Sequence, residues 1–449
     1  MSDALETKLD EIFPTLVEEL KELIRIPSVS SGSFDQERVW DSARWVESKL
    51  AQRGLTTEIL TAEDPSGGAG RPAVVAKTPH LEGAPTVLLY AHHDVQPAGD
   101  ASRWTTPPFE PDVRDGRLYG RGSSDDGAGV LVHLGALSLL ETDLGVNVTV
   151  FIEGEEEIGS PSFPNFLRTY HEKLQADYIV VADSDNWTVD VPALTASLRG
   201  VVDATVKVKV LDHALHSGMF GGPILDAVTL ACRLIATFHD ENGAVAVAGL
   251  GGNTEADVEW DEADFRRDSS LLEGTKLVGV GDLASRMWTQ PALSIIGFDA
   301  TSVAQASNTI SPECTFKVSL RTVPGEDGRA AMDALVAHVK QHAPFGANVE
   351  VTEGEVGPSY QADLESPAAR IAHECLTQAW GVDSVNIGVG GSIPFISDFQ
   401  REFPNAQVIV TGVEDPATNA HSEDESQDLS VLRNAILAHT LMLQRFANA

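Results

Sequence analysis

The sequence predicts an α/β protein in which a larger domain, with a mixed and largely parallel sheet covered by helices, is interrupted by a smaller α+β domain. Short apolar runs alternate with helical patterns between residues 86 and 183, as expected for parallel strands joined by helices. The pattern changes to strictly alternating strands after Arg199 and returns to longer apolar segments after Tyr360. We therefore predict that residues 1–198 and 361–449 form the larger domain and residues 199–360 the inserted one.

The elements of the larger domain follow from the spacing of apolar residues. Leu5, Leu9, Ile12 and Leu16 recur at helical spacing, and a second helical stretch covers 41–53. Short apolar runs are expected to be strands, and longer periodic segments are expected to be helices. The predicted strands are 86–91, 146–153, 176–183 and 406–413, and the further helices are 126–141, 367–381 and 428–447.

The inserted segment has a different pattern. Residues 200–210 and 314–324 alternate apolar and polar side chains, whereas 224–240 and 329–342 have helical periodicity. A strand that alternates in this way buries one face only. We therefore expect a sheet with helices on one face and an open face opposite.

Composition excludes several classes of protein. With 31 Lys and Arg against 67 Asp and Glu, the net charge of −36 would repel nucleic acid and anionic membrane surfaces. Cys232, Cys314 and Cys375 are far apart and lack CxxC spacing, so neither a disulfide framework nor a thiolate metal site is expected. The acidic N-terminus lacks the features of a secretory signal, and there is no apolar run long enough to span a membrane. We expect a cytoplasmic protein.

The side chains that follow four of the apolar runs are of metal-ligand type. They are His92 and Asp94, Glu155 to Glu157, Asp183 and His421, with Asp125 and Asp126 at the start of a predicted helix. Taken singly, such a histidine is an ordinary satisfied polar residue and an aspartate before a helix is an N-cap. In open α/β sheets, however, ligands gather at the carboxyl ends of strands. The joint placement therefore favours a functional site.

A histidine and carboxylate set without cysteine suits Zn²⁺, Mn²⁺ or Co²⁺ in a hydrolytic site. Two metals that share one carboxylate would need two histidines and three carboxylates, and one more carboxylate would remain free to take a proton from water. The run Glu155 to Glu157 offers both roles, because adjacent residues beyond a strand point in different directions. The alternative is a solvated acidic turn.

Several short blocks of sequence carry a family resemblance. In order along the chain they are YAHHDVQP, LYGRGSSDDGAG, IEGEEEIGS, LRG, HSGMFGG, GGSIP and AHSEDE. Together they resemble the M20 metallopeptidase family, particularly its dipeptidase branch, which is related to cytosolic nonspecific dipeptidase and carnosinase. The resemblance spans nearly the whole chain.

The resemblance implies a role for each residue of the candidate site. His92 and Asp183 would bind one metal, Glu157 and His421 the other, and Asp125 would bridge the two. Asp94 would orient His92, and Glu156 would be the general base and then the proton donor. The family also implies a cis peptide bond between Asp125 and Asp126.

The resemblance also gives the inserted domain a role as a lid and dimerisation domain. His216 would reach the active site of a partner chain and stabilise the oxyanion. The residues expected to bind substrate are Asn308, Arg321, Gly390, Gly391 and Ser392. Arg321 could equally pair with a surface acid. One departure concerns Gly388, because related dipeptidases often carry an arginine at that position.

The resemblance implies a metallopeptidase, a dipeptidase or exopeptidase, that cleaves dipeptides or similarly short peptides with a metal-bridging water activated by Glu156. Two divalent ions per chain are expected, zinc in the first place and manganese or cobalt as alternatives. The nearest rival is an N-acyl-amino-acid amidohydrolase of the same fold. A non-catalytic dimeric binding protein would not need Glu156 beside a full ligand set, and a calcium-binding protein would show EF-hand spacing. The expected partners are therefore a small peptide substrate and a second copy of the chain.

Overall fold

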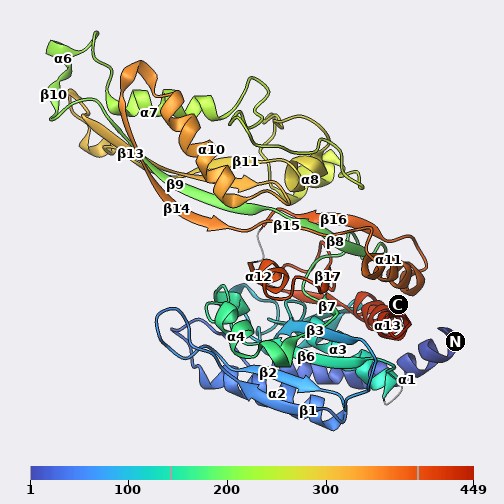
Figure 1. The fold of residues 1–449 in the computed structure, drawn as a ribbon. Helices are drawn as coiled ribbons and strands as arrows, with labels where there is room; N and C mark the ends of the chain where they lie inside the picture. Colours follow the sequence, from blue (N-terminus) through green and yellow to red (C-terminus); the bar gives the residue numbers. More distant parts are fainter. Residues whose placement is uncertain (1, 142–143, 392–393, 449) are drawn as a thin grey trace. The chain divides into compact units, whose positions relative to one another are not determined.

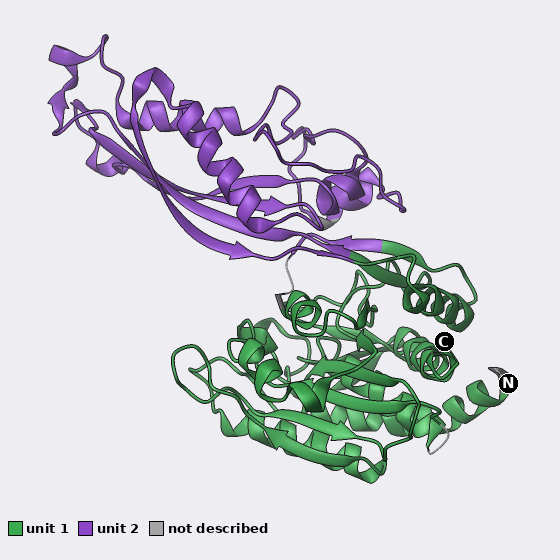
Figure 2. Ribbon diagram, viewed as in Figure 1, with its two compact units in different colours: residues 1–196, 362–386, 395–449 green, residues 197–361, 387–394 purple. Residues whose placement is uncertain are grey.

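The chain forms two compact units (Figures 1 and 2), seen in a computed structural model that describes residues 2–141, 144–391 and 394–448. Unit 1 consists of residues 1–196, 362–386 and 395–449, and unit 2 of residues 197–361 and 387–394. The grouping differs from the predicted segments mainly in the short stretch 387–394, which the sequence analysis placed with the larger domain. Within unit 2, the carbonyl of Gly390 accepts a hydrogen bond from Arg199 (3.3 Å).

Unit 1 is built on a six-stranded mixed sheet in the order β1-β2-β6-β3-β7-β17. The strands are β1 (Thr56–Leu60), β2 (Ala73–Lys77), β3 (Thr86–His92), β6 (Asn147–Glu153), β7 (Tyr178–Val181) and β17 (Gln407–Val410). The four strands β6, β3, β7 and β17 are parallel; β2 pairs antiparallel with β6, and β1 pairs antiparallel with β2. The carboxyl ends of the four parallel strands therefore lie side by side at the same end of the sheet.

Helices cover both faces of this sheet, which confirms the predicted α/β architecture. They are α1 (Ser2–Ile24), α2 (Glu37–Gln52), α3 (Gly127–Leu140), α4 (Phe163–Thr169), α5 (His171–Leu174), α11 (Pro367–Trp380), α12 (Pro394–Glu402) and α13 (Leu429–Phe446). Leu89 of β3 packs into an aliphatic core with α3 and α13, whereas Tyr90 contacts Phe163 and Phe395 on the other face. None of the helices in the described ranges combines the length and apolar character that crossing a membrane requires.

Unit 2 contains an antiparallel sheet in the order β11-β13-β9-β14. Its strands are β9 (Gly200–Lys209), β11 (Ala292–Asp299), β13 (Glu313–Thr322) and β14 (Asn348–Gly357). The helices α7 (Ala227–Ile235) and α10 (Gly328–Gln341) pack on one face and bury alternate residues of β9, such as Val206 and Val208. The intervening residues of β9 from Asp203 onward are only half-buried, as the alternating sequence predicted.

The shorter elements complete the two units. They are β4 (Asp112–Arg114), β5 (Arg117–Tyr119), β8 (Ala193–Leu198), β10 (Leu215–His216), β12 (Thr309–Ile310), β15 (Tyr360–Gln361), β16 (Val385–Val389), β18 (Ser426–Asp428), α6 (Ser217–Phe220), α8 (Glu262–Asp268) and α9 (Leu283–Trp288). Strand β18 pairs with β5, so the segment that follows His421 lies beside the segment that leads to Asp125. This pairing matters for the site described next.

Candidate metal centre

The predicted ligands of unit 1 meet at the carboxyl edge of its sheet. His92 ends β3, Asp183 follows β7 by two residues, and Glu157 lies in a short 3-10 helix just after β6. Asp125 precedes α3, and His421 lies in the loop between β17 and β18. Five residues from distant parts of the sequence are therefore presented by the ends of parallel strands and by the loops beside them.

The five side chains form two groups that share Asp125. His92, Asp125 and Asp183 make one group and Asp125, Glu157 and His421 the other, with the ligand atoms of each group within 4.8 Å of one another. Asp125 Oδ1 lies 3.1 Å from His92 Nε2, while its Oδ2 lies 2.8 Å from His421 Nε2. His421 Nε2 is also 3.1 Å from Glu157 Oε2, and His92 Nε2 is 3.9 Å from Asp183 Oδ1. One carboxylate thus presents one oxygen to each group.

Burial shifts the protonation of the carboxylates in this cluster. Burial and the nearby charge of Asp125 raise the pKa of Glu157 to about 7 and that of Asp183 to about 6. Burial acts against ionisation of Asp125 as well, but hydrogen bonds with His421 and His92 hold its pKa well below the usual range. Hydrogen bonds with Asp125 and Glu157 raise the pKa of His421 to about 10. The positive charges that lower the pKa values of Glu157 and Asp183 come from His92 and His421.

The donor set fits divalent metal ions. Nitrogen and carboxylate oxygen are the only ligand types present, which suits Zn²⁺, Mn²⁺ or Co²⁺ better than Cu⁺ or an iron–sulfur cluster. A cation in each group would offset the repulsion between Asp125, Glu157 and Asp183, a repulsion that adds to burial in raising the pKa values of Glu157 and Asp183. The two carboxylate oxygens of Asp125 face different groups, an arrangement that suits a carboxylate shared between two cations.

Asp94 connects His92 to the glutamate turn. His92 Nδ1 is 2.9 Å from the backbone carbonyl of Asp94 and 3.5 Å from its carboxylate. The same carboxylate accepts hydrogen bonds from the backbone N–H groups of Glu156 (3.2 Å) and Glu157 (3.1 Å). Asp94 therefore holds the turn that carries the two glutamates, a contact that the sequence analysis did not foresee.

The three consecutive glutamates are in different surroundings. Glu155 accepts hydrogen bonds from Ser162 and from the backbone of Arg71, so its carboxylate anchors the loop. Glu157 points into the cluster and also accepts hydrogen bonds from Gln96. The Glu156 carboxylate makes no hydrogen bond within the described part of the chain, and burial raises its pKa well above the usual value. It is the glutamate that is free to exchange a proton.

Glu425 was missed by the sequence analysis. Its carboxylate is fully buried and accepts hydrogen bonds from the backbone N–H groups of Gly122 (3.1 Å), Ser124 (3.1 Å) and Asp125 (3.2 Å). Arg121 Nη1 donates to the same carboxylate at 2.6 Å. The peptide bond between Asp125 and Asp126 is cis, as predicted. The position of Glu425 in the AHSEDE block, four residues after His421, is the signal that could have drawn attention to it.

The predicted residues of unit 2 fall into two groups at opposite ends of its sheet (Figure 1). His216 pairs with Thr309 of β12, and the neighbouring Ser217 N–H donates to the carbonyl of Asn308 (3.0 Å), so His216 and Asn308 lie together and exposed. Arg321 is near the other end of β13, opposite Val201 of β9.

The glycine-rich loop belongs to the Arg321 end of the sheet. Gly390 contacts Arg199, the residue immediately before β9, while a side chain added at Gly391 would meet open space. Ser392 lies outside the described residues. Along β13, about 3.3 Å per residue separates the two ends, which places Glu313 roughly 25 Å from Arg321. Asn308 and His216 are thus not brought together with Arg321 in one chain.

Comparison with known proteins shows which family the chain belongs to. The model of peptidase family M20/M25/M40 matches residues 88–445. A cysteinylglycine-S-conjugate dipeptidase of Corynebacterium striatum is 34% identical over 440 residues, which cover 95% of this chain and 94% of that protein. The chain belongs to peptidase family M20/M25/M40.

Further relatives of the M20/M25/M40 chain lie at lower identity. Beta-Ala-His dipeptidase of Homo sapiens is 28% identical over 437 residues, covering 91% of this chain and 85% of that protein. The solved structure of Dug1p, a di-peptidase from Saccharomyces cerevisiae, has a TM-score of 0.77 at 24% identity, over 100% of this chain and 99% of that one. The structural likeness supports the fold.

In metal-free protein, the free energy of unfolding is expected to fall as the pH rises from about 4.5 to 7, because burial raises the folded pKa of Glu157 to about 7 and that of Asp183 to about 6. The folded state then holds more protons than the unfolded chain, and its stability is lost as the pH rises through these values. His421 acts with the same sign between its ordinary value of 6.5 and about 10.

Urea unfolding of chelator-treated protein over a pH series measures this effect. Glu157→Gln should flatten the dependence, whereas Glu82→Gln, at an exposed position, should not. A stability that increases over the interval in the metal-free protein would contradict the assignment.

Proposed function

We propose that this chain is a di-metal dipeptidase that hydrolyses dipeptides or similarly short peptides. The observation that carries the proposal is the arrangement of Asp125, whose two oxygens each face one histidine of the two ligand groups. The free carboxylate of Glu156 beside them supplies the base that hydrolysis needs. Relatives named as Cys-Gly and Beta-Ala-His dipeptidases support a short peptide as the substrate.

In this proposal, His92 and Asp183 would hold one ion, Glu157 and His421 would hold the other, and Asp125 would contribute to both sites. We propose zinc as the ion in the first place. Manganese and cobalt are alternatives, because all three ions accept nitrogen and carboxylate ligands. When bound, such ions polarise the scissile carbonyl and lower the pKa of water.

The protein side chains move the protons. Glu156 takes the proton of the attacking water and then gives it to the nitrogen of the leaving amine, for which its raised pKa is suited. Asp94 keeps Glu156 in place, because its carboxylate accepts the Glu156 backbone N–H. His92 is held in orientation through Nδ1 by the Asp94 carbonyl, so that Nε2 faces Asp125.

We further propose that the enzyme is a homodimer formed through unit 2, with His216 acting on the partner's substrate. His216 and Asn308 lie roughly 25 Å or more along the sheet from Arg321, a distance that no dipeptide spans. A second copy is needed to bring both groups to one substrate. Met219 and Phe220, next to His216, are 75% and 44% exposed, which is typical of an interface.

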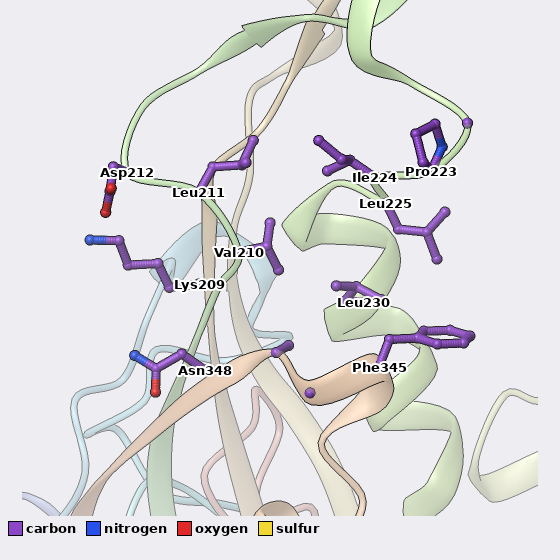
Figure 3. A pocket seen from close by; sticks show the side chains of 13 residues that line it. Lys209, Val210, Leu211, Asp212, Pro223, Ile224, Leu225, Leu230, Phe345 and Asn348 are labelled. Carbon is purple, nitrogen blue, oxygen red and sulfur yellow. The ribbon is translucent and has the colours of Figure 1, made fainter.

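A hollow near this end of unit 2 has apolar side chains along one side and Lys209, Asp212 and Asn348 along the other (Figure 3). It measures about 890 Å³, and Ile224, Leu225 and Phe345 line one side of it. Phe345 is 78% exposed and Leu225 40%. A partner chain that covered these side chains would remove them from water.

The three unpaired cysteines, Cys232, Cys314 and Cys375, suit a reducing compartment. We propose a cytoplasmic location on that ground.

Metal-reconstituted protein is expected to hydrolyse dipeptides such as L-alanyl-L-alanine and to lose this activity when a chelator removes the metal. Zn²⁺, Mn²⁺ or Co²⁺ should restore the activity, with two ions bound per chain by elemental analysis. A panel with N-acetyl and N-succinyl amino acids separates a dipeptidase from an amidohydrolase. Preference for the acylated amino acids, or full activity without metal, would contradict the proposal.

Glu156→Gln should lower kcat by at least about 10²-fold and leave the metal content unchanged, because an amide cannot accept the proton of water. Glu157→Gln should instead lower metal occupancy, since Glu157 belongs to a ligand group. Steady-state kinetics and elemental analysis of both variants provide the comparison. If Glu156→Gln loses metal and Glu157→Gln retains it, the roles of the two residues are reversed.

Mixed dimers test the position of His216. A chain with Glu156→Ala lacks the proposed base, and a chain with His216→Ala lacks the proposed oxyanion donor, a loss that costs about 10²–10³ in kcat. Each chain is therefore expected to be inactive as a homodimer. In the mixed dimer, the chain with intact Glu156 receives an intact His216 from its partner, so one site recovers. Purified mixed dimers that remain as inactive as the homodimers, or an active monomer, would exclude action across the dimer.

A further inference from the structure

Two buried histidines of unit 1, His133 and His439, have no role in the site described so far. We infer that they are positioning residues for the ligand group of His92, Asp125 and Asp183. They act by holding backbone carbonyls of β3 and β7, the strands that lead to His92 and Asp183. The inference rests on the proposed function and deepens it, because it concerns how one of the two proposed metal sites keeps its shape.

His133 holds a carbonyl of β3. It lies on α3, is only 1% exposed, and its Nε2 is 2.9 Å from the carbonyl oxygen of Tyr90. A carbonyl can only accept a hydrogen bond, so Nε2 carries the proton and donates. The same oxygen accepts the backbone N–H of Ala182 (3.2 Å), the residue before Asp183. Since Tyr90 precedes His92 by two residues, this one carbonyl fastens the chain beside both ligands.

His439 holds a carbonyl of β7 through a threonine. It lies on α13, is 2% exposed, and its Nε2 is 2.9 Å from Thr411 Oγ1. The Thr411 hydroxyl donates its one proton to the carbonyl of Val181 (3.1 Å), so it accepts from the Nε2–H of His439. The Val181 carbonyl also accepts the backbone N–H of Thr411 (2.9 Å), and Val181 precedes Asp183 by two residues. Each imidazole therefore holds a carbonyl two residues before a ligand of the same group.

The two imidazoles are an unfavourable way to fill a core. Burial lowers the pKa of His133 to about 4 and that of His439 well below its ordinary value, so both rings are neutral at pH 7. Because Nε2 carries the proton in each ring, Nδ1 is an acceptor, and among the described residues neither Nδ1 has a hydrogen-bond partner. A buried acceptor without a partner destabilises the folded state, and an apolar side chain would avoid this loss. The favourable polar contact of each ring is the one that its Nε2 makes with the strand ends.

The other ligand group is held by different contacts. Asp94 accepts the backbone N–H of Glu157, and Gln96 donates to the Glu157 carboxylate. The competing explanation is that the two buried histidines only fill the core of unit 1. That explanation predicts that their loss weakens both ligand groups equally, whereas a positioning role predicts a loss confined to the group of His92 and Asp183.

Zinc affinities of proteins with one intact ligand group test the inference. His421→Asn leaves the group of His92, Asp125 and Asp183 intact, and Asp183→Asn leaves the other group intact. Adding His133→Leu should raise the zinc Kd of the His421→Asn protein by about 10–100-fold, and that of the Asp183→Asn protein by less than about 3-fold. Competition with a chelator of known affinity measures the Kd values. An equal loss in both proteins, no loss in either, or a loss only in the Asp183→Asn protein would overturn the inference.

A conservative variant tests whether the N–H donor of His133 is the group that matters. Glutamine also ends in an N–H donor that can serve the Tyr90 carbonyl, whereas leucine has no donor. In the His421→Asn protein, His133→Gln should therefore keep the zinc Kd within about 3-fold of the parent value. A loss as large as that of His133→Leu would show that the ring acts through packing, and the positioning role would fail.

His338 of unit 2 provides a matched control for His439. It is also buried, and its Nε2 is 2.9 Å from Thr237 Oγ1, which donates to the carbonyl of Leu234 (2.7 Å). In the His421→Asn protein, His439→Leu should raise the zinc Kd by about 10–100-fold, whereas His338→Leu removes the same kind of contact and should leave it unchanged. A loss of similar size in both would mean that the effect does not depend on the strand ends.

Amide hydrogen exchange of the metal-free protein separates this inference from the proposed reaction. His133→Leu should raise exchange by about 10-fold in peptides that cover β3 and β7, and should leave peptides that cover 155–159 unchanged. If the wild-type protein hydrolyses no dipeptide but the selective effects on zinc affinity and exchange are found, the proposed reaction fails and the positioning role stands. If dipeptides are hydrolysed but His133→Leu changes affinity and exchange equally for both ligand groups, the proposed function stands and this inference fails.

Discussion

The buried carboxylate of Glu425 is the contact on which the candidate metal centre depends. It accepts three backbone N–H groups from the loop that ends in Asp125, and it pairs with the buried Arg121. Since Glu425 follows His421 by four residues, one side chain ties together two ligand loops that are about 300 residues apart in sequence. Removing one member of such a buried pair typically costs about 3–5 kcal/mol. The position of the shared ligand therefore depends on a residue that touches no ligand atom.

The strand ends concentrate negative charge that the metal-free protein does not balance. Asp125 lies within 4.8 Å of Asp183 in one group and of Glu157 in the other, and burial raises the pKa of Glu157 to about 7. The mixed sheet produces this arrangement, because its four neighbouring parallel strands have their carboxyl ends side by side. Fold and chemistry are thus coupled, since the strands that build the core also force the carboxylates together. Unit 2 shows the opposite case, where two arginines, Arg199 and Arg321, share a face and, among the described residues, no acid pairs with either.

Much of the fold could be predicted from periodicity. The strands at 86–91 and 146–153, the buried helix at 126–141 and the alternating strands of the inserted domain all form at, or within a residue or two of, the predicted positions, because their apolar spacing leaves one way to bury them. The stretch 387–394, which the sequence analysis assigned to the larger domain, groups with unit 2 through contacts of Gly388 and Gly390 with distant residues. No local pattern records such contacts.

The sequence by itself determined the residue types of the site and the strand ends that carry them, because histidines and acids after apolar runs are visible in one dimension. Only the tertiary structure decided how they are used. It gave Glu155, Glu156 and Glu157 different surroundings, with Glu155 bonded to Ser162 and Glu157 in a group with Asp125 and His421, and it made Asp94 an acceptor for the backbone of the glutamate turn. It also left Arg199 buried beside Arg321, since the register of two strands far apart in sequence sets which charges meet.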